Sequence, residues 1–178
     1  MSKTIFYGVM SLDGFIAGEN DDMSWAEKYL GADEDYGWME LVQSCGAVLM
    51  GRKTFEFELK NAPDLERILP TYVFTEQPLR FDGIRDSNLH FIAGDLREVV
   101  ATIMHKHRGN LFIGGGAMLL DTLLVMDLVD ELRLFVAPEL IQSGVRLFTG
   151  SKIQSRFEVQ SSIKYASGLV QIHLTKAS

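Results

Sequence analysis

Two glycine-containing turns in this sequence have the residue types of anion-binding sites. The first is MGRKTFE at 50–56, where an apolar segment ends, Gly51 allows a close turn, and Arg52 and Lys53 begin a predicted helix. The dipole of a helix disfavours cations at its start, so these two side chains need a partner there. A phosphate group would supply one, because free N–H groups and two cations would converge on it. A solvated turn with two exposed bases is the alternative interpretation.

The second turn is FIGGGAMLLD at 112–121, with three consecutive glycines between an apolar strand and an apolar helix. Bare backbone N–H groups at such a helix start can hold a pyrophosphate. Gly114 and Gly116 match the first two glycines of the dinucleotide fingerprint, but Leu119 stands where the third is expected. A flexible turn is the alternative for this motif alone. Together the two turns favour an elongated ligand with several phosphates, such as a dinucleotide.

The segment SLDGFIAGEN at 11–20 contains a carboxylate beside a glycine. Asp13 and Gly14 between apolar flanks signal first of all a tight turn, and Gly18 adds mobility to the residues after it. A plain turn is the simpler interpretation of Asp13, with direct catalysis as the alternative. The functional interpretation is that the segment forms a loop that closes over a ligand.

Three acidic residues, Asp33, Glu34 and Asp35, open a predicted helix that also carries Trp38. Carboxylates at a helix start are stabilised by the dipole, so capping is the default interpretation for all three. A carboxyl group that faces an apolar pocket is harder to ionise, however, and could donate a proton as a general acid.

The composition limits the classes of partner. The chain has 178 residues, a net charge of −7 and 47% hydrophobic residues, which predicts one soluble globular domain over 1–178. Without a Lys/Arg stripe, neither nucleic acid nor an anionic membrane is an expected partner. Cys45 is the only cysteine, which excludes an internal disulfide and favours a reducing compartment such as the cytoplasm. The four histidines lack metal-ligand spacing, so no metal site is predicted.

The elements that must position these residues alternate between strand and helix. Apolar segments predict strands at 3–12, 47–50, 71–74, 89–92, 111–113 and 131–138. Helical spacing or position predicts helices at 33–44, from 52 onwards, 96–107 and 117–128. Alternating segments at 157–165 and 168–175 predict an antiparallel pair. This order predicts an α/β fold with a mostly parallel sheet, helices on both faces and an antiparallel C-terminal edge, with ligands beyond the carboxyl ends of the strands.

Four segments, SLDGFIAG, MGRKTFE, FIGGGAML and VDELRLFVAP, together resemble the dihydrofolate reductase superfamily from Lys3 to about Thr175. The nearer resemblance is to the C-terminal reductase domain of the bifunctional riboflavin-biosynthesis deaminase-reductase. It implies a dihydrofolate-reductase-like fold, a homodimer and NADPH as the hydride donor. The acceptor would be an unsaturated carbon of a pterin-like or ribosylamino-pyrimidine-like substrate, as in 5-amino-6-(5-phosphoribosylamino)uracil reductase.

The resemblance also implies roles for individual residues. Cofactor phosphates would be held by Gly51, Arg52, Lys53 and Thr54; the pyrophosphate by Gly114, Gly115, Gly116, Ala117 and Leu119; the adenosine ribose would lie by Thr75, and the nicotinamide carboxamide by Val9, Ile16 and Ala17. Asp35 precedes Gly51 by 51 − 35 = 16 residues, which is similar to the spacing of the acidic pterin-binding residue in bacterial dihydrofolate reductases. Asp35 would therefore be the proton donor or substrate anchor, with Trp38 and Asp13 as further substrate-site candidates.

Two departures from the family pattern leave a second function open. Many relatives carry a basic residue after the strand at 71–74, where this chain has TEQ, so recognition of the NADPH 2′-phosphate would depend on Arg52 and Lys53. The substrate region also lacks a distinctive acid/base pair. The alternative is a dimeric NADP-binding protein with a regulatory role and no turnover.

Overall fold

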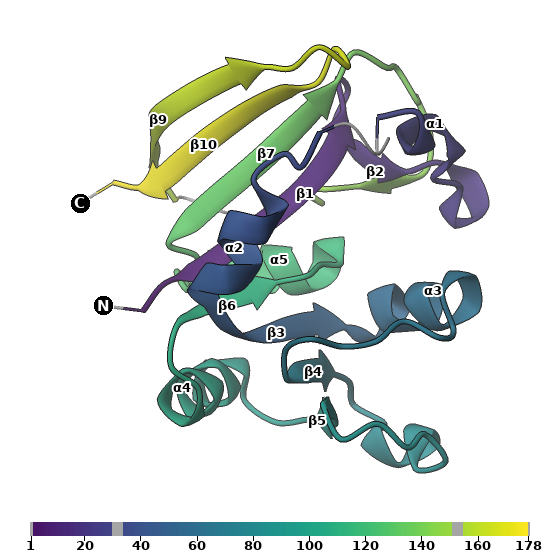
Figure 1. Ribbon diagram of the computed structural model, residues 1–178, viewed down its shortest axis with the longest axis vertical. Helices are drawn as coiled ribbons and strands as arrows, with labels where there is room; N and C mark the ends of the chain where they lie inside the picture. The colour runs from purple at the N-terminus through teal and green to yellow at the C-terminus, as the bar shows by residue number, and fades with distance from the viewer. Residues whose placement is uncertain (1, 30–33, 151–154, 178) are drawn as a thin grey trace.

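The computed structural model describes residues 2–29, 34–150 and 155–177 (Figure 1). Within these residues, eight strands form one sheet in the order β5-β4-β3-β6-β1-β7-β10-β9. Their bounds are Thr4–Ser11 (β1), Cys45–Gly51 (β3), Thr71–Phe74 (β4), Leu89–Ile92 (β5), Asn110–Ile113 (β6), Glu131–Ala137 (β7), Phe157–Lys164 (β9) and Val170–Lys176 (β10). The first six strands of this order are parallel, whereas β10 runs antiparallel to both of its neighbours. The predicted sheet, including its antiparallel C-terminal edge, is confirmed.

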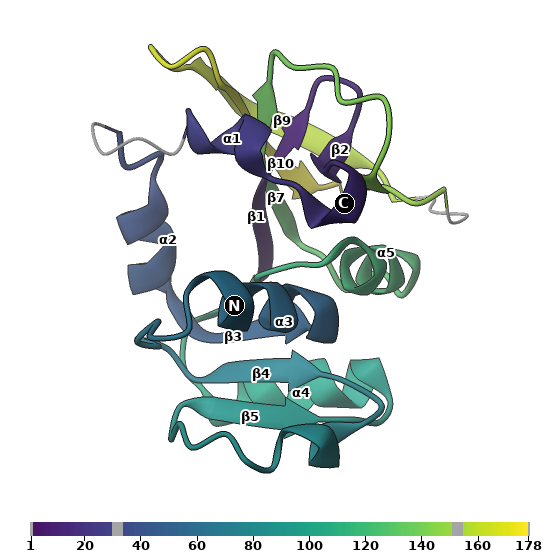
Figure 2. The same ribbon diagram turned by 90° about the vertical axis from the view of Figure 1, so that its right-hand side faces the viewer.

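Helices cover both faces of the sheet, as predicted. They are α2 (Trp38–Ser44), α3 (Arg52–Asn61), α4 (Leu96–Lys106) and α5 (Ala117–Val125). Figure 2 shows α2 and α5 on opposite sides of β1. Alternation along β1 explains this arrangement, because Phe6 packs with residues of α4 and α5 while Ile5 packs on the other face against Leu41 of α2. Phe55 of α3 packs on the same face as α2, since Val48 contacts both clusters.

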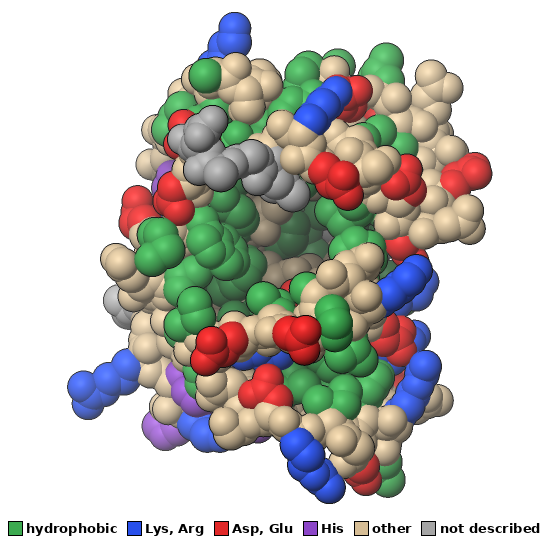
Figure 3. All heavy atoms as spheres, turned by 45° about the vertical axis from the view of Figure 1, so that its right-hand side comes forward, with side chains coloured by type: hydrophobic (Ala, Val, Ile, Leu, Met, Phe, Trp, Pro, Cys, Tyr) green, Lys and Arg blue, Asp and Glu red, His purple; other side chains and the backbone are tan. Residues whose placement is uncertain are grey.

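In Figure 2, α2, α3 and the segment after β1 surround one region of the molecule. The space-filling view shows the surface hollowed at its centre, with hydrophobic side chains around the opening (Figure 3). We call this feature the central hollow. It lies at the end of the molecule where the parallel strands terminate, which is where ligands of such sheets bind.

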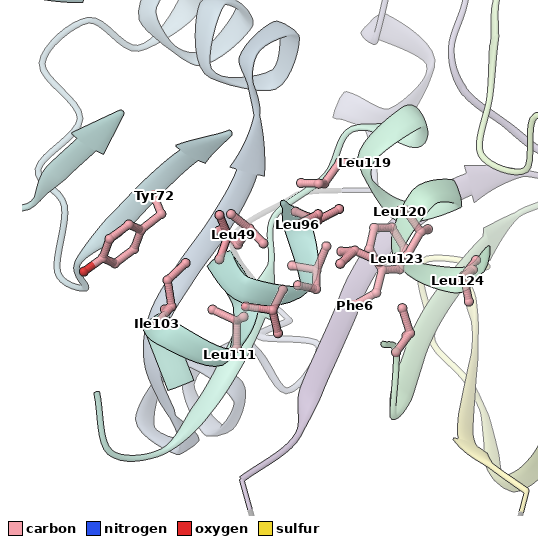
Figure 4. Close-up of a cluster of buried hydrophobic side chains, with 14 of the residues drawn as sticks. Phe6, Leu49, Tyr72, Leu96, Ile103, Leu111, Leu119, Leu120, Leu123 and Leu124 are labelled. Atoms are coloured by element: carbon pink, nitrogen blue, oxygen red, sulfur yellow. The ribbon is translucent and has the colours of Figure 1, made fainter. Parts of the chain in front are cut away.

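The main core lies beneath α4 and α5 (Figure 4). Leu49, Leu111 and Ile113 come from the two central strands β3 and β6, and each is at most 1% exposed. Leu120 and Leu123 of α5 close the cluster from the helical side. Burying such side chains stabilises the fold by roughly 1.5–3 kcal/mol each. The same contacts fix α5 against the sheet, and therefore fix the glycine turn at its start.

Several short elements were not predicted. They are β2 (Phe15–Ala17), β8 (Val145–Arg146), α1 (Ser24–Glu27) and two 3-10 turns, η1 (Glu19–Asp21) and η2 (Pro78–Phe81). The helix predicted at 33–44 begins only at Trp38, because Tyr36 and Gly37 have φ values of 53° and 76° and cannot continue a helix. Asp33 lies outside the described residues. In the part of the chain that is described, no helix is long and apolar enough to cross a membrane.

The packing of α5 predicts the effect of truncating its buried face. Leu123→Ala should lower the free energy of unfolding by about 2–5 kcal/mol, because it leaves a cavity in the core. Met118→Ala is the matched control on the same helix, since Met118 is 74% exposed, and should change stability by less than about 0.5 kcal/mol. Urea unfolding followed by circular dichroism measures both. Equal losses in the two variants would contradict this assignment of the core.

Candidate active site

The two predicted anion-binding turns touch each other. The backbone N–H of Gly51 donates to the carbonyl of Gly115 over 2.7 Å, and that of Gly114 donates to the carbonyl of Leu49 over 2.9 Å. Because β3 and β6 are neighbouring parallel strands, α3 and α5 begin side by side at one edge of the sheet (Figure 2). The two helix starts can therefore act on a single ligand.

Two of the glycines in this close approach are constrained by their surroundings or backbone conformation. A Cβ atom at Gly51 would lie 3.4 Å from the backbone nitrogen of Gly116, and one at Gly116 would lie 3.0 Å from Oγ1 of Thr54. Gly115 also has a φ of 101°, a conformation that other residues rarely adopt. A side chain at Gly115 would strain the backbone and one at Gly116 would crowd Thr54, whereas a Cβ atom at Gly51 would make only an ordinary van der Waals contact. The glycines thus leave bare backbone at the surface where a ligand would bind.

The starts of α3 and α5 differ from the start of α4. The side chain of Asp95 caps α4 by accepting from the N–H groups of Arg97 and Glu98 over 2.9 and 3.1 Å. Gly51 and Gly116 provide no side-chain cap for α3 and α5. The first N–H groups of these two helices therefore remain available to an anion. Such a pair of helix starts fits the phosphates of a dinucleotide.

Three cations lie near the start of α3. A terminal nitrogen of Arg52 contacts Glu56 at 2.6 Å, and Arg80 of η2 contacts the other oxygen of the same carboxylate at 3.2 Å. Lys53 is exposed and forms no ion pair with the described carboxylates. Sequence reasoning missed Arg80, which is five residues beyond Thr75 and reaches this site only through the fold. The signal that could have identified Arg80 is that it is a basic residue shortly after the strand at 71–74.

Thr75 directly follows β4 and precedes Arg80 by five residues. Its N–H donates to the carbonyl of Ile92 over 2.9 Å, and its hydroxyl accepts from the N–H of Gln77 over 3.2 Å. The side chain is buried, so the residue fixes the turn that leads from β4 to Arg80. Its predicted place beside an adenosine ribose stays a prediction.

Asp13 forms the predicted tight turn and also binds a distant segment. The N–H of Gly14 donates to the carbonyl of Ser11 over 2.9 Å, which closes the turn. The Asp13 carboxylate accepts from the Ser11 hydroxyl over 2.6 Å and from the N–H groups of Ile141 and Gln142 over 3.1 and 2.8 Å. The hydrogen bond from Ser11, followed by those from Gln142 and Ile141, lowers the pKa of Asp13 to about 2. Its role at a substrate stays a prediction, because these donors already occupy both of its oxygens.

Asp35 is an exposed residue at the start of α2. Its carboxylate oxygens lie 3.2 and 3.3 Å from the N–H of Met39, so it helps to cap the helix, which was the default interpretation. Nothing in this geometry assigns it to proton transfer, and that role stays a prediction. Its charge nevertheless lies close enough to Tyr7 and Tyr165 to raise the pKa of each phenol, after the larger effect of burial.

Aromatic side chains cluster beside the start of α2. Trp38 is 41% exposed, and its ring lies 5.6 Å from that of Tyr7 and 5.5 Å from that of Phe112. Burial, with Tyr165 and Asp35 adding to it, raises the pKa of Tyr7, whose phenol is therefore neutral at physiological pH. The Tyr7 hydroxyl donates to the carbonyl of Tyr36 over 3.3 Å. Planar apolar surfaces of this kind suit a heterocyclic ring.

The remaining predicted residues belong to two places in the fold. Thr54, Ala117 and Leu119 lie at the joined helix starts, where Ala117 and Leu119 are buried and offer backbone rather than side chain. Val9 is on β1 and packs within the Tyr7 cluster, while Ile16 and Ala17 form β2. No group of three or more His, Cys, Asp or Glu residues in the described part of the chain is arranged to hold a metal ion.

The sheet order and helix positions define a dihydrofolate-reductase-like α/β protein. Dihydrofolate reductase from Enterococcus faecalis, solved with NADP(H), has the same fold, with a TM-score of 0.68 over 99% of this chain and 97% of that one at 15% identity. The RibD C-terminal domain family matches residues 3–171, and the chain therefore belongs to that family. The suspected branch of the superfamily is confirmed.

Two further proteins are similar over nearly their whole length. The uncharacterized protein YwjB of Bacillus subtilis is 30% identical over 176 residues, covering 98% of each chain. A putative riboflavin biosynthesis protein from Shewanella sp. PV-4 has a TM-score of 0.85 at 25% identity, covering 99% of each chain.

The hydrogen bonds of Asp13 predict a pH-dependent contribution to stability. Its pKa in the folded state is below the ordinary value of about 3.9, so the ionised carboxylate stabilises the fold above pH 4 and loses this effect as the pH falls towards 2. Asp13→Asn should therefore lower the free energy of unfolding by a constant amount down to about pH 5, with a difference from wild type that shrinks below about pH 4. Urea unfolding at a series of pH values measures this, and a difference that does not change with pH would contradict it.

Proposed function

We propose that the protein is an NADPH-dependent reductase that transfers a hydride to an unsaturated carbon of a small heterocyclic or sugar-derived substrate, either pterin-like or ribosylamino-pyrimidine-like. The observation that carries the proposal is the contact between the two uncapped glycine turns, where the Gly51 N–H meets the Gly115 carbonyl over 2.7 Å. It provides two adjacent helix starts for one polyphosphorylated ligand. Membership of the RibD C-terminal domain family and the fold shared with an NADP(H)-bound dihydrofolate reductase support the same conclusion.

In this proposal, different residues of the chain bind different parts of NADPH. The N–H groups that begin α3 and α5 hold the phosphates, and Arg52 and Lys53, joined by Arg80, neutralise the 2′-phosphate. Thr75 lies by the adenosine ribose. Val9, Ile16 and Ala17 border the nicotinamide carboxamide. Bound NADPH supplies the hydride.

The other side of the central hollow would receive the substrate. Trp38 and Tyr7 offer aromatic surface that excludes water and orients a flat ring next to Val9. Asp35 would supply the proton or anchor the substrate from the start of α2.

We further propose that the protein acts in the cytoplasm as a homodimer. The exposed apolar side chains of Val159 and Ile163 on the edge strand β9 are consistent with a second copy.

A dimeric NADP-binding regulatory protein without turnover is the second candidate, and the exposure of Asp35 favours it. Incubation with NADPH and panels of pteridines, pyrimidines and quinones separates the two. Steady NADPH oxidation with any of them supports the reductase. Tight NADPH binding without oxidation by any compound supports the regulatory protein, and no binding of NADPH would remove both.

Recognition of the 2′-phosphate can be tested with one charge on α3. Lys53→Gln should weaken NADPH binding about tenfold and NADH binding by less than about twofold, because only NADPH carries the 2′-phosphate. Lys60→Gln is the matched control, since it removes the same charge from the other end of the same helix and should change neither affinity. Quenching of tryptophan fluorescence measures the six dissociation constants of the wild type and the two variants. Similar losses for both nucleotides would contradict the assignment.

The role of Asp35 can be tested once a substrate from the panel is found. Asp35→Asn keeps an oxygen that can accept from the Met39 N–H, so α2 should form normally. It should lower kcat by about 100-fold through loss of proton transfer, with the NADPH affinity unchanged within about twofold. Glu34→Gln makes the neighbouring carboxylate neutral and serves as the control. Equal loss of turnover and NADPH affinity in Asp35→Asn would contradict the role.

A further inference from the structure

The segment at 138–147, which follows β7 and includes β8, lies against the turn that joins β1 to β2. The two regions are far apart in sequence, yet Asp13 accepts from the N–H groups of Ile141 and Gln142. We propose that Asp13 is a positioning residue whose carboxylate holds segment 138–147 against β2 and so places Ile16 and Ala17 at the nicotinamide. This inference rests on the proposed function.

The carboxylate holds segment 138–147 at a point where its backbone is strained. Gln142 has a φ of 69°, in the left-handed region that residues other than glycine rarely adopt. Its N–H and that of Ile141 both point at Asp13, over 2.8 and 3.1 Å. Two successive N–H donors to one carboxylate compensate for such a conformation, because charge-assisted hydrogen bonds are stronger than neutral ones. Removing the carboxylate should therefore release this part of the segment.

Ser11 connects Asp13 to β2 through two hydrogen bonds. The fully buried Ser11 hydroxyl donates to Asp13 over 2.6 Å and accepts from the N–H of Phe15 over 2.9 Å. Phe15 is the first residue of β2, whose next two residues are Ile16 and Ala17. One continuous set of hydrogen bonds thus connects Gln142 with the start of the strand that would border the nicotinamide.

The two segments are also packed too closely for one to move alone. Gly144 has a φ of 125°, and a Cβ atom there would lie 2.3 Å from the carbonyl oxygen of Ala17. The guanidinium of Arg146 lies 4.4 Å from the centre of the Phe15 ring and donates to the backbone carbonyl of Asp13 over 3.2 Å. Leu147 donates its N–H to the carbonyl of Gly14 over 2.9 Å. A shift of segment 138–147 must therefore be accompanied by a shift of β2.

A positioning role and a general contribution to stability predict different losses of ligand affinity. Asp13 acts on the residues that would border the nicotinamide, whereas the phosphates would be held by the starts of α3 and α5. A small displacement of the residues that bind one end of a ligand can weaken the contacts at that end and leave the contacts at the other end unchanged. Ligands with and without the nicotinamide should therefore respond differently to the same substitution.

The experiment compares NADPH with adenosine 2′,5′-bisphosphate, which lacks the nicotinamide and its ribose, by calorimetric titration of the full chain. For Asp13→Asn we expect the dissociation constant of NADPH to rise about tenfold and that of the bisphosphate to change by less than about twofold. Asp95→Asn is the matched control. It removes the same charge from a carboxylate that likewise accepts from two backbone N–H groups, at the start of α4, and should change neither constant.

Amide hydrogen exchange of the ligand-free protein gives a second measurement. Asp13→Asn should speed exchange at 141 and 142, and Asp95→Asn should not. If Asp13→Asn does not fold, Ser11→Ala provides the test, because it keeps the contacts of Asp13 with 141 and 142 and removes the two hydrogen bonds through which Ser11 links Asp13 to Phe15. It should weaken NADPH binding selectively and in the same direction.

The affinities for the two ligands separate the positioning role of Asp13 from the proposed function. Equal weakening of both ligands, or unchanged NADPH affinity in folded variants while the wild type binds NADPH, would overturn the positioning role and leave the proposed function standing. Failure of the wild type to bind NADPH would overturn both.

Discussion

The backbone contact between Gly51 and Gly115 determines the arrangement of the candidate site. It exists because β3 and β6 are adjacent and parallel, and because each continues into a helix at the same edge of the sheet. The buried leucines of α5 hold one of these helices in place from below. β1 lies next to β6 on the other side and carries β2 and the turn at Asp13 towards the same edge. The helix starts, the aromatic side chains beside α2 and the loop after β1 thus lie towards the same edge of the sheet.

The two groups of residues that flank the candidate site have opposite chemistry. On the side of α3 and α5, bare N–H groups and the bases Arg52 and Lys53 favour negative charge. On the side of α2, the rings of Tyr7 and Trp38 favour a planar apolar group, and burial raises the pKa of Tyr7 so that its phenol stays neutral. A ligand pair with an anionic portion and a flat heterocycle matches both sides. This complementarity supports a reductase more directly than any single side chain does.

Local pattern predicted most of the fold and only part of the site. The strands around Leu49 and Ile113 are uninterrupted apolar segments, and the helix that carries Leu123 is a long apolar segment that follows three glycines, so local pattern identifies them. The two glycine turns come directly after those strands. β2 and β8 contain three and two residues, so they have no periodicity to detect. Their pairing depends on segments that meet only in three dimensions, as does the approach of Arg80 to Arg52 through Glu56. The late start of α2 depends on backbone conformation at Tyr36, which residue type does not specify.

The close packing of Gly144 on Ala17 has a consequence for other members of the family. With a φ of 125° and a backbone oxygen 2.3 Å from the position of a Cβ atom, no side chain fits there while β2 and β8 keep their present pairing. A homologue with alanine or a larger residue at the aligned position must carry a differently shaped loop beside β2. The identity of that one amino acid therefore offers a way to sort homologous sequences by loop architecture before any of their coordinates are known.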